Sequence, residues 1–406
     1  MSCLLIIFFN LSPTSQLPII KKPKIQPATY RLTETSVRDN IRFGRFVSLH
    51  NQTEKKSCQA PVDKVGFMKT HKTASSTIQN ILLRFGMNSG WNFVFPTRGN
   101  HLGDPQHLTQ LTEPFSRDWI KNVPWKPMTD KEGYNIFALH TKWNQKEVEK
   151  ILGKSAKYIT ILRDPVDNFE SLYNYVHFND TFRMNLKDFV HFYIEKRKPI
   201  QRVHRYLGRN QQLWDLGLLQ KDITNIDAVR RKIEEIDENF DLVMIAEDFN
   251  ASLVFLSEEL CWPLANMTSL KVNARKESAV EKLSQKARDI LQDWLWADQM
   301  LYDHFKEKLE KRKQIYGPNK LENEIKQLVK YNEDVEKYCV DKIVSNNTKK
   351  LGADFIPFSK DVVGFEINVK EHPYCKYYGI SENQFIDELR QMQISRFRQW
   401  GKSPSN

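Results

Sequence analysis

Residues 64–77 read KVGFMKTHKTASST, and this stretch decides the fold class. Its first five residues form a short, mainly apolar run that is typical of a buried strand. After a polar loop, Ile78, Ile81, Leu82 and Phe85 follow at helical spacing, which places them on one face of a helix. We therefore predict a strand–loop–helix junction, in which backbone amides and the positive end of the helix dipole point toward the loop.

The loop carries side chains that suit an anionic ligand. Lys72 adds a positive charge, and the hydroxyl groups that follow add hydrogen-bond donors. The candidate binding residues are Lys69, His71, Lys72, Thr73, Ala74, Ser75, Ser76 and Thr77. The glycines of a Walker loop are absent, so we expect the loop to hold a smaller group than a triphosphate. The simpler alternative is that Thr73 or Ser75 only caps the helix, although capping requires neither a lysine nor a histidine.

The rest of the pattern predicts an α/β fold. Further short strands are expected at 135–139, 157–162 and 242–246, and helices at 167–176, through 253–260 and from about 279 to 309. Strands that alternate with helices indicate a central parallel sheet covered by helices on both faces.

Composition limits the class of partner. The chain has 61 Lys and Arg against 50 Asp and Glu, a formal net charge of +11, and 40% of its residues are hydrophobic. A basic surplus suits anionic ligands in general. Because the charge is dispersed and lacks interleaved aromatic residues, nothing indicates a nucleic-acid partner.

Two segments resemble a known family. The stretch FMKTHKTASST resembles the 5′-phosphosulfate loop of the galactose 3-O-sulfotransferase family, which includes the galactosylceramide sulfotransferases. Residues 161–173, ILRDPVDNFESLY, resemble the 3′-phosphate segment of that family, and residues 273–276, NARK, are similar to a less specific third segment. The resemblance implies a P-loop-like sulfotransferase fold and transfer of a sulfuryl group from 3′-phosphoadenosine-5′-phosphosulfate (PAPS). The implied acceptor is a galactose hydroxyl, expected to be the 3-hydroxyl, on a glycolipid or glycoprotein, with no metal required.

The resemblance also assigns roles to particular residues. It places the 3′-phosphate of PAPS on Arg163 and Ser171. Arg275 could add a further nucleotide contact, although a solvated run of charged residues explains that segment at least as well. A guanidinium can bind a phosphate bidentately, and a hydroxyl can add a donor. Lys72 is expected at the oxygen of the departing phosphate.

Two histidines compete as the base that takes the proton of the acceptor hydroxyl. His140 follows the second predicted strand, where ligand crevices of open α/β sheets lie. His71 adjoins Lys72 in the loop and could instead donate a hydrogen bond to the phosphosulfate. Position favours His140 as base and His71 as donor. Aromatic residues within 91–143 could stack on the acceptor sugar, although core packing is the commoner role for each of them.

The expected location follows from the family, which implies an anchored Golgi protein with a lumenal catalytic domain. The apolar run from Cys3 to Phe9 is too short to span a bilayer, so we expect either a truncated anchor or a soluble protein. Six Asn-x-Ser/Thr sequons suit a lumenal glycoprotein. In an oxidising lumen Cys339 and Cys375 could form a disulfide, and free buried thiols remain equally compatible with the sequence.

Three regions are predicted: an apolar stub and stem at 1–60, a catalytic domain at 61–310 and a charged, partly helical extension at 311–406. A P-loop kinase is the nearest enzymatic alternative, but it would need loop glycines and an acidic magnesium ligand. A catalytically lapsed nucleotide-binding protein is the other alternative. It should have lost Lys72, His140, Arg163 or Ser171, all of which are present.

Overall fold

The computed structural model describes residues 60–103, 111–270, 283–345, 363–369 and 372–402. Within these ranges a four-stranded parallel sheet lies at the centre of the molecule, in the order β2-β1-β3-β4. Its strands are β1 (Val65–Met68), β2 (Ile136–Phe137), β3 (Lys157–Leu162) and β4 (Leu242–Ile245). They are short and almost entirely buried, as expected of parallel strands covered on both faces.

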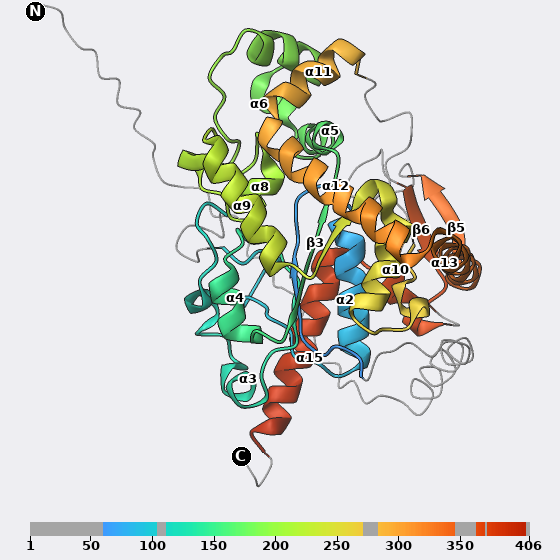
Figure 1. Cartoon of the computed structure of the whole chain (residues 1–406). Helices are drawn as coiled ribbons and strands as arrows, with labels where there is room; N and C mark the ends of the chain where they lie inside the picture. The colour runs from blue at the N-terminus through green and yellow to red at the C-terminus, as the bar shows by residue number, and fades with distance from the viewer. Residues whose placement is uncertain (1–59, 104–110, 271–282, 346–362, 370–371, 403–406) are drawn as a thin grey trace, which may run out of the picture.

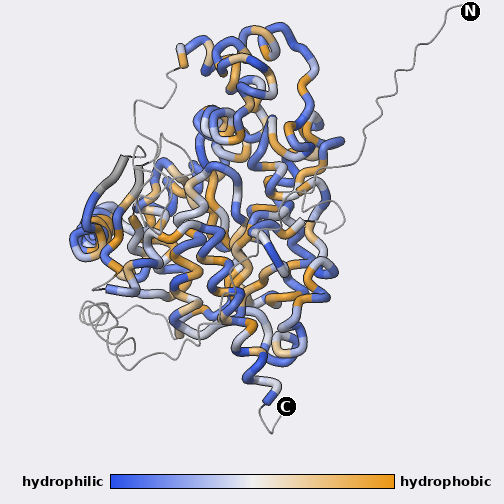
Figure 2. The backbone as a smooth tube through the Cα atoms, turned by 180° about the vertical axis from the view of Figure 1, so that it is seen from behind, coloured by the Kyte–Doolittle hydropathy of each residue, from blue (hydrophilic) through white to orange (hydrophobic). Residues whose placement is uncertain are grey.

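Helices surround this sheet (Figure 1), with α4 and α9 on one side and α2 and α10 on the other. The helices of the described ranges are α2 (Ser75–Asn88), α3 (Lys126–Glu132), α4 (Gln145–Leu152), α5 (Pro165–Tyr175), α6 (Phe178–Phe182), α7 (Leu186–Phe189), α8 (Gln211–Asp215), α9 (Ile226–Asn239), α10 (Phe249–Glu259), α11 (Gln285–Trp294), α12 (Trp296–Tyr316), α13 (Pro318–Cys339), α14 (Lys376–Gly379) and α15 (Glu382–Trp400). The hydrophobic residues gather along the strands and on the helix faces turned toward them (Figure 2). The predicted α/β fold is confirmed.

The prediction of one continuous helix at 279–309 is wrong. Its first four residues lie outside the described ranges, and the remainder is two helices that meet at Leu295. The physical reason is that they pack against different clusters. Leu291 and Leu295 join a separate cluster with α5, α6 and α7, whereas Leu301 joins the main core around the sheet. A break in the helix lets both apolar faces be buried.

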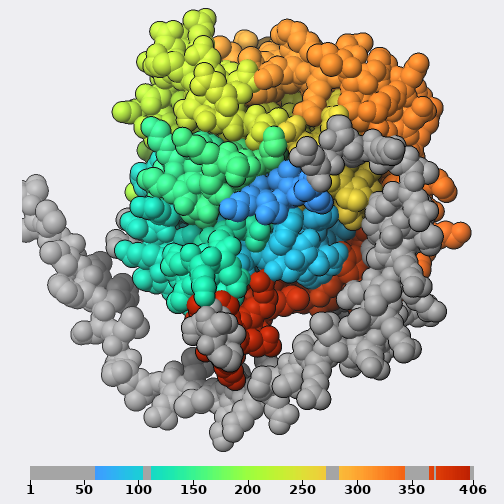
Figure 3. All heavy atoms as spheres, turned by 60° about the horizontal axis from the view of Figure 1, so that its bottom comes forward, coloured from blue at the N-terminus to red at the C-terminus, as the bar shows by residue number. Residues whose placement is uncertain are grey.

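The C-terminal segment contributes to the main core. Phe385, Ile386 and Leu389 of α15 are buried among the residues that cover the sheet, and α15 lies against α2. Figure 3 shows this segment, in red, directly against the blue and cyan residues at the start of the described chain. The region expected as an extension therefore supplies a helix to the same core as β1.

A disulfide joins Cys339, the last residue of α13, to Cys375 just before α14. Of the two alternatives that the sequence left open for these cysteines, the structure contains the disulfide and not the free thiols. Between them lies an antiparallel hairpin of β5 (Val340–Ser345) and β6 (Val363–Ile367). Within the described residues no helix is long and apolar enough to cross a lipid bilayer.

Candidate active site

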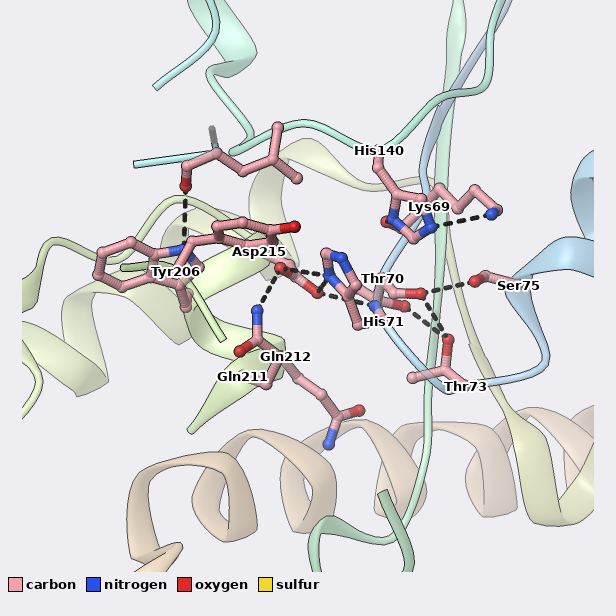
Figure 4. A network of polar contacts seen from close by, with 12 residues as sticks. Lys69, Thr70, His71, Thr73, Ser75, His140, Tyr206, Gln211, Gln212 and Asp215 are labelled. Atoms are coloured by element: carbon pink, nitrogen blue, oxygen red, sulfur yellow. Dashed lines mark hydrogen bonds and ion pairs between the residues drawn. The ribbon is translucent and has the colours of Figure 1, made fainter. Parts of the chain in front are cut away.

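The loop after β1 is braced by its own polar side chains (Figure 4). Thr70 Oγ1 donates to the carbonyl of Ile161 at 2.6 Å and lies 2.7 Å from Thr73 Oγ1. Ser75 Oγ donates to the carbonyl of Thr70 at 2.6 Å. The hydroxyls of Thr73 and Ser75, which we expected to face a ligand, are used within the loop. These hydroxyl groups hold the loop backbone in place. The groups that the loop can present to an anion are therefore its backbone N–H groups.

The first turn of α2 keeps backbone amides available for such an anion. Ala74 at its N-cap position has φ of 65°, and no side chain caps the helix. The alternative that Thr73 or Ser75 only caps the helix is therefore wrong. Lys72 is left-handed as well, with φ of 61°. Turns of this kind gather N–H groups into anion-binding concavities, to which the helix dipole adds. The Lys72 ammonium lies 3.6 Å from the ring centre of Tyr175.

Arg163 lies directly after β3, beside this loop. One of its guanidinium nitrogens, Nη1, donates to the carbonyl of Lys72 at 3.3 Å. Its backbone is held by the amide of Gln212, which accepts from Arg163 N–H at 2.8 Å and donates to its carbonyl at 2.9 Å. The structure thus brings together the two segments singled out in the sequence.

Helix α5 follows Arg163 and packs beside the loop. Asn168 donates from Nδ2 to the carbonyl of His71 at 2.8 Å, which ties α5 to the loop. Ser171 is buried one turn further along. Within the described residues no hydrogen bond joins its side chain to Arg163. Arg275, the third predicted nucleotide contact, lies outside the described residues.

His71 forms a hydrogen-bonded pair with Asp215, the last residue of α8. Its Nδ1 lies 2.9 Å from Asp215 Oδ2, and its backbone N–H donates to the same oxygen at 2.8 Å. Gln211 Nε2 donates to Asp215 Oδ1 at 2.8 Å. A carboxylate that receives donors in this way fixes a proton on Nδ1 of His71, so that Nε2 carries the lone pair. The ring of Tyr206 lies 6.1 Å away.

His140 has a partner at each ring nitrogen. Its Nδ1 lies 3.0 Å from the carbonyl of Lys69 and therefore carries the proton, while Nε2 lies 2.9 Å from the Lys69 ammonium. Its ring stacks on His71 at 4.2 Å and on His101 at 5.3 Å. Burial, reinforced by the charge of Lys69, holds the pKa of His140 well below its usual range. Burial and then the neighbouring His71 and Lys69 lower the pKa of His101 to about 4.

Helix α12 holds α8 in place through the side chain of Asp298. Asp298 accepts the backbone N–H of Gln212 at 3.0 Å and of Leu213 at 2.9 Å, which caps the first turn of α8. Burial raises the pKa of Asp298 to about 7. Because α8 ends at Asp215, this cap helps to fix the partner of His71.

The aromatic residues considered as an acceptor wall pack elsewhere. Phe93, Phe95, Trp125 and Trp143 are buried in the main core, and Trp91 packs against it. Core packing is therefore their role in this structure. Among the described residues no group of three or more His, Cys, Asp and Glu side chains is arranged to hold a metal ion.

Sequence reasoning missed three acidic residues that organise the site: Asp215, Asp298 and Glu382. The first two each stand among apolar neighbours in a helical stretch, which is a weak signal for a buried carboxylate. Glu382, whose carboxylate forms an ion pair with Lys69, follows Ser381 at a helix start. That pattern predicts a helix N-terminus but not the ion pair.

Fold and site together define a parallel α/β protein with a strand–loop–helix junction of the kind that binds anions. A family model described as galactose-3-O-sulfotransferase matches residues 31–393, and the chain belongs to that family. It is 32% identical over 291 residues to the galactosylceramide sulfotransferase of Bos taurus, a match that covers 70% of this chain and 65% of that protein.

Two further relatives extend the comparison. The galactosylceramide sulfotransferase of Mus musculus is 32% identical over 82% of this chain and 79% of its own length. The galactose-3-O-sulfotransferase 2 of Mus musculus is 29% identical over 70% of this chain and 71% of its own length. The resemblance seen in the loop sequences is therefore confirmed at the level of the family.

Proposed function

We propose that the protein transfers the sulfuryl group of PAPS to a galactose hydroxyl, expected to be the 3-hydroxyl, on a glycolipid or glycan. Family membership supports the reaction, and the names of the relatives support the acceptor. The observation that carries the proposal is the meeting of two segments 91 residues apart, where Arg163 Nη1 donates to the carbonyl of Lys72. These are the segments that resemble the family's 5′-phosphosulfate and 3′-phosphate sites.

The donor would be held by charge and by backbone amides. The uncapped first turn of α2 and the Lys72 ammonium suit the 5′-phosphosulfate, while Arg163 and Ser171 suit the 3′-phosphate. PAPS supplies a sulfuryl group already bonded to a phosphate leaving group. In this proposal Lys72 stabilises the negative charge that grows on the bridging oxygen as the sulfur–oxygen bond breaks.

For the base we propose His71, which reverses the preference drawn from the sequence. Both ring nitrogens of His140 are engaged by Lys69, whereas Nδ1 of His71 is held by Asp215 and Nε2 is the nitrogen left to accept a proton. As the acceptor hydroxyl attacks sulfur, its proton passes to Nε2 of His71. The carboxylate of Asp215 stabilises the imidazolium that forms, as in other His–Asp pairs.

The compartment is part of the proposal. A disulfide between Cys339 and Cys375 suits an oxidising lumen, because cytosolic thiols are kept reduced. Together with the family, this supports a catalytic domain that works in the lumen of the Golgi.

Transfer of radiolabelled sulfate tests the reaction and its regiochemistry together. The protein is incubated with labelled PAPS and with galactosylceramide, a β-galactoside or the matching 3-deoxy-β-galactoside. We expect label on the first two acceptors and none on the third. Equal labelling of the 3-deoxy sugar would contradict the 3-hydroxyl assignment. Absence of label on every acceptor would overturn the proposed function.

A further inference from the structure

The first residue of α15 reaches into the centre of the site. Glu382 Oε2 lies 2.6 Å from Lys69 Nζ, although the two residues are 313 positions apart in the sequence. The Lys69 side chain is 1% exposed and that of Glu382 is 22% exposed. An ammonium buried to this degree requires a nearby negative charge, because its desolvation is otherwise uncompensated.

The same ammonium is in contact with His140. Because Nδ1 of His140 carries its proton toward the Lys69 carbonyl, Nε2 is an acceptor and the ammonium must donate to it, at 2.9 Å. Lys69 therefore holds the imidazole from two directions, through its backbone and through its side chain. The face of that imidazole lies 4.2 Å from the ring of His71.

Glu382 is itself fixed by contacts on two sides. Its Oε1 accepts from Asn100 Nδ2 at 3.2 Å, and its Oε2 accepts from Ser76 Oγ at 3.4 Å. Ser381 caps the helix, and a carboxylate in the first turn is favoured by the positive end of the helix dipole. Burial opposes ionisation of Glu382, but the charge and hydrogen bond of Lys69 outweigh it and lower its pKa.

We propose that Glu382 is a positioning residue of the active site, which holds the Lys69 ammonium against His140 and so makes helix α15 part of the catalytic centre. This inference rests on the proposed function. It extends the site to a segment of the chain about 300 residues from the loop, in the region expected from sequence to be an extension.

The charges around Lys69 explain why no other group substitutes for Glu382. Besides Glu382 on α15, the titratable groups that interact with Lys69 are His140 and His101, and Tyr175 on α5 interacts with the Glu382 carboxylate. Asp215 on α8 supplies the other carboxylate near these imidazoles, because it interacts with His101. The carboxylate of Asp215 already accepts the imidazole and the backbone N–H of His71. Loss of Glu382 would therefore leave Lys69 with the imidazoles of His140 and His101 and, among the described residues, without a carboxylate paired to it.

The test compares Glu382→Gln with Glu388→Gln, a matched control on the same helix. Glu388 Oε1 pairs with Lys376 Nζ at the same 2.6 Å, but at a partly exposed position away from the loop. Each full-length variant is assayed for sulfate transfer from PAPS to a β-galactoside. We expect Glu382→Gln to lower kcat by about 10- to 100-fold with KM for the galactoside changed by less than about threefold. Glu388→Gln should match the parent in both constants.

Two further readouts separate positioning from general support of the fold. In Glu382→Gln the fall of kcat at high pH should begin at lower pH than in the parent, because a buried ammonium without a counter-ion loses its proton more readily. Glu382→Asp, which keeps the charge on a shorter side chain, should recover part of kcat and the parental pH profile. If Glu382→Gln does not fold, the same comparison is made with Glu382→Asp, whose kcat should then lie measurably below that of Glu388→Gln.

The outcomes distinguish this inference from the proposed function. A parent that sulfates galactose, with a Glu382→Gln variant of equal kcat and pH profile, would overturn the role of Glu382 alone. A parent that transfers no sulfate would overturn the proposed function on which it rests.

Discussion

His71 and Asp215 lie 144 positions apart in the sequence and form the closest imidazole–carboxylate pair of the site, with Nδ1 2.9 Å from Oδ2. Asp215 is 1% exposed, and it also receives a hydrogen bond from Gln211. The pair fixes the tautomer of His71 and leaves Nε2 as its acceptor. This pairing makes His71 the better candidate for the base than His140, because both ring nitrogens of His140 are engaged by Lys69.

Replacing Asp215 with Asn should therefore impair the chemical step. An amide cannot stabilise the imidazolium that forms on His71 and can hold the wrong tautomer, so we expect kcat to fall by roughly 10²-fold or more. The measurement is the rate of sulfate transfer at saturating substrates. Asp237→Asn is the matched control, because Asp237 pairs with His304 at 3.0 Å on the surface. Equal activity of the two variants would contradict the role of Asp215.

Stability should depend on pH through His101. Its pKa in the folded protein is about 4, below the ordinary value of 6.5, so between these values the unfolded chain binds a proton that the folded chain does not. The free energy of unfolding should therefore fall as the pH is lowered from 6.5 to 4. Urea unfolding of His101→Gln should show an acid-induced loss that is smaller by about 3 kcal/mol. An identical pH dependence in parent and variant would contradict the assignment.

Other groups titrate in the same range, and the comparison removes them. Asp298 has a raised pKa of about 7 and acts in the opposite direction, since the folded protein retains its proton as the pH rises from 3.8 to 7. It is present in both proteins, so the difference between parent and His101→Gln reports His101.

Ala74 adopts a left-handed conformation that favours glycine. Its φ of 65° costs about 1–2 kcal/mol for a residue with a Cβ. A glycine avoids this cost, but its greater conformational freedom in the unfolded chain offsets part of the gain. Ala74→Gly should therefore raise the free energy of unfolding by about 0.5 kcal/mol, measured by urea denaturation. Ala287→Gly, within helix α11, should lower it by about 1 kcal/mol. A loss of stability in Ala74→Gly would speak against this loop conformation.

The disulfide should stabilise the C-terminal part of the molecule. Cys339 and Cys375 are separated by 36 positions, and closing a loop of that length is worth about 3–4 kcal/mol in the chain-entropy description. The double variant Cys339→Ser, Cys375→Ser should melt at a lower temperature than the parent when both are compared without reductant. Parental melting in the double variant would show that the bond contributes nothing to stability.

Much of the fold was predictable because it depends on local patterns. The strand at 157–162 has the predicted bounds, and β1 and β4 differ from the prediction by one residue each. Apolar runs of four to six residues between helical patterns identify buried parallel strands well. The strand expected at 135–139 is only Ile136–Phe137, because β2 lies at the edge of the sheet, where its outer side meets only an isolated bridge to Phe93.

The site was predictable only where one segment of sequence carries it. Residues 69–77 and Arg163 could be found from their residue types, and they do lie together. The partners Asp215 and Glu382 could not be found, since each meets the loop only through the packing of a distant helix. The split of the predicted helix at Leu295 has the same origin, because its cause is the presence of two separate clusters.

The most direct test of the account compares Lys72→Ala with the exposed control Lys154→Ala in the transfer of labelled sulfate from PAPS to a β-galactoside. If Lys72 stabilises the departing phosphate, its loss should lower kcat by about 10²- to 10³-fold, while Lys154→Ala remains like the parent. Parental activity in Lys72→Ala would contradict the assignment of the loop after β1 as the site of sulfuryl transfer.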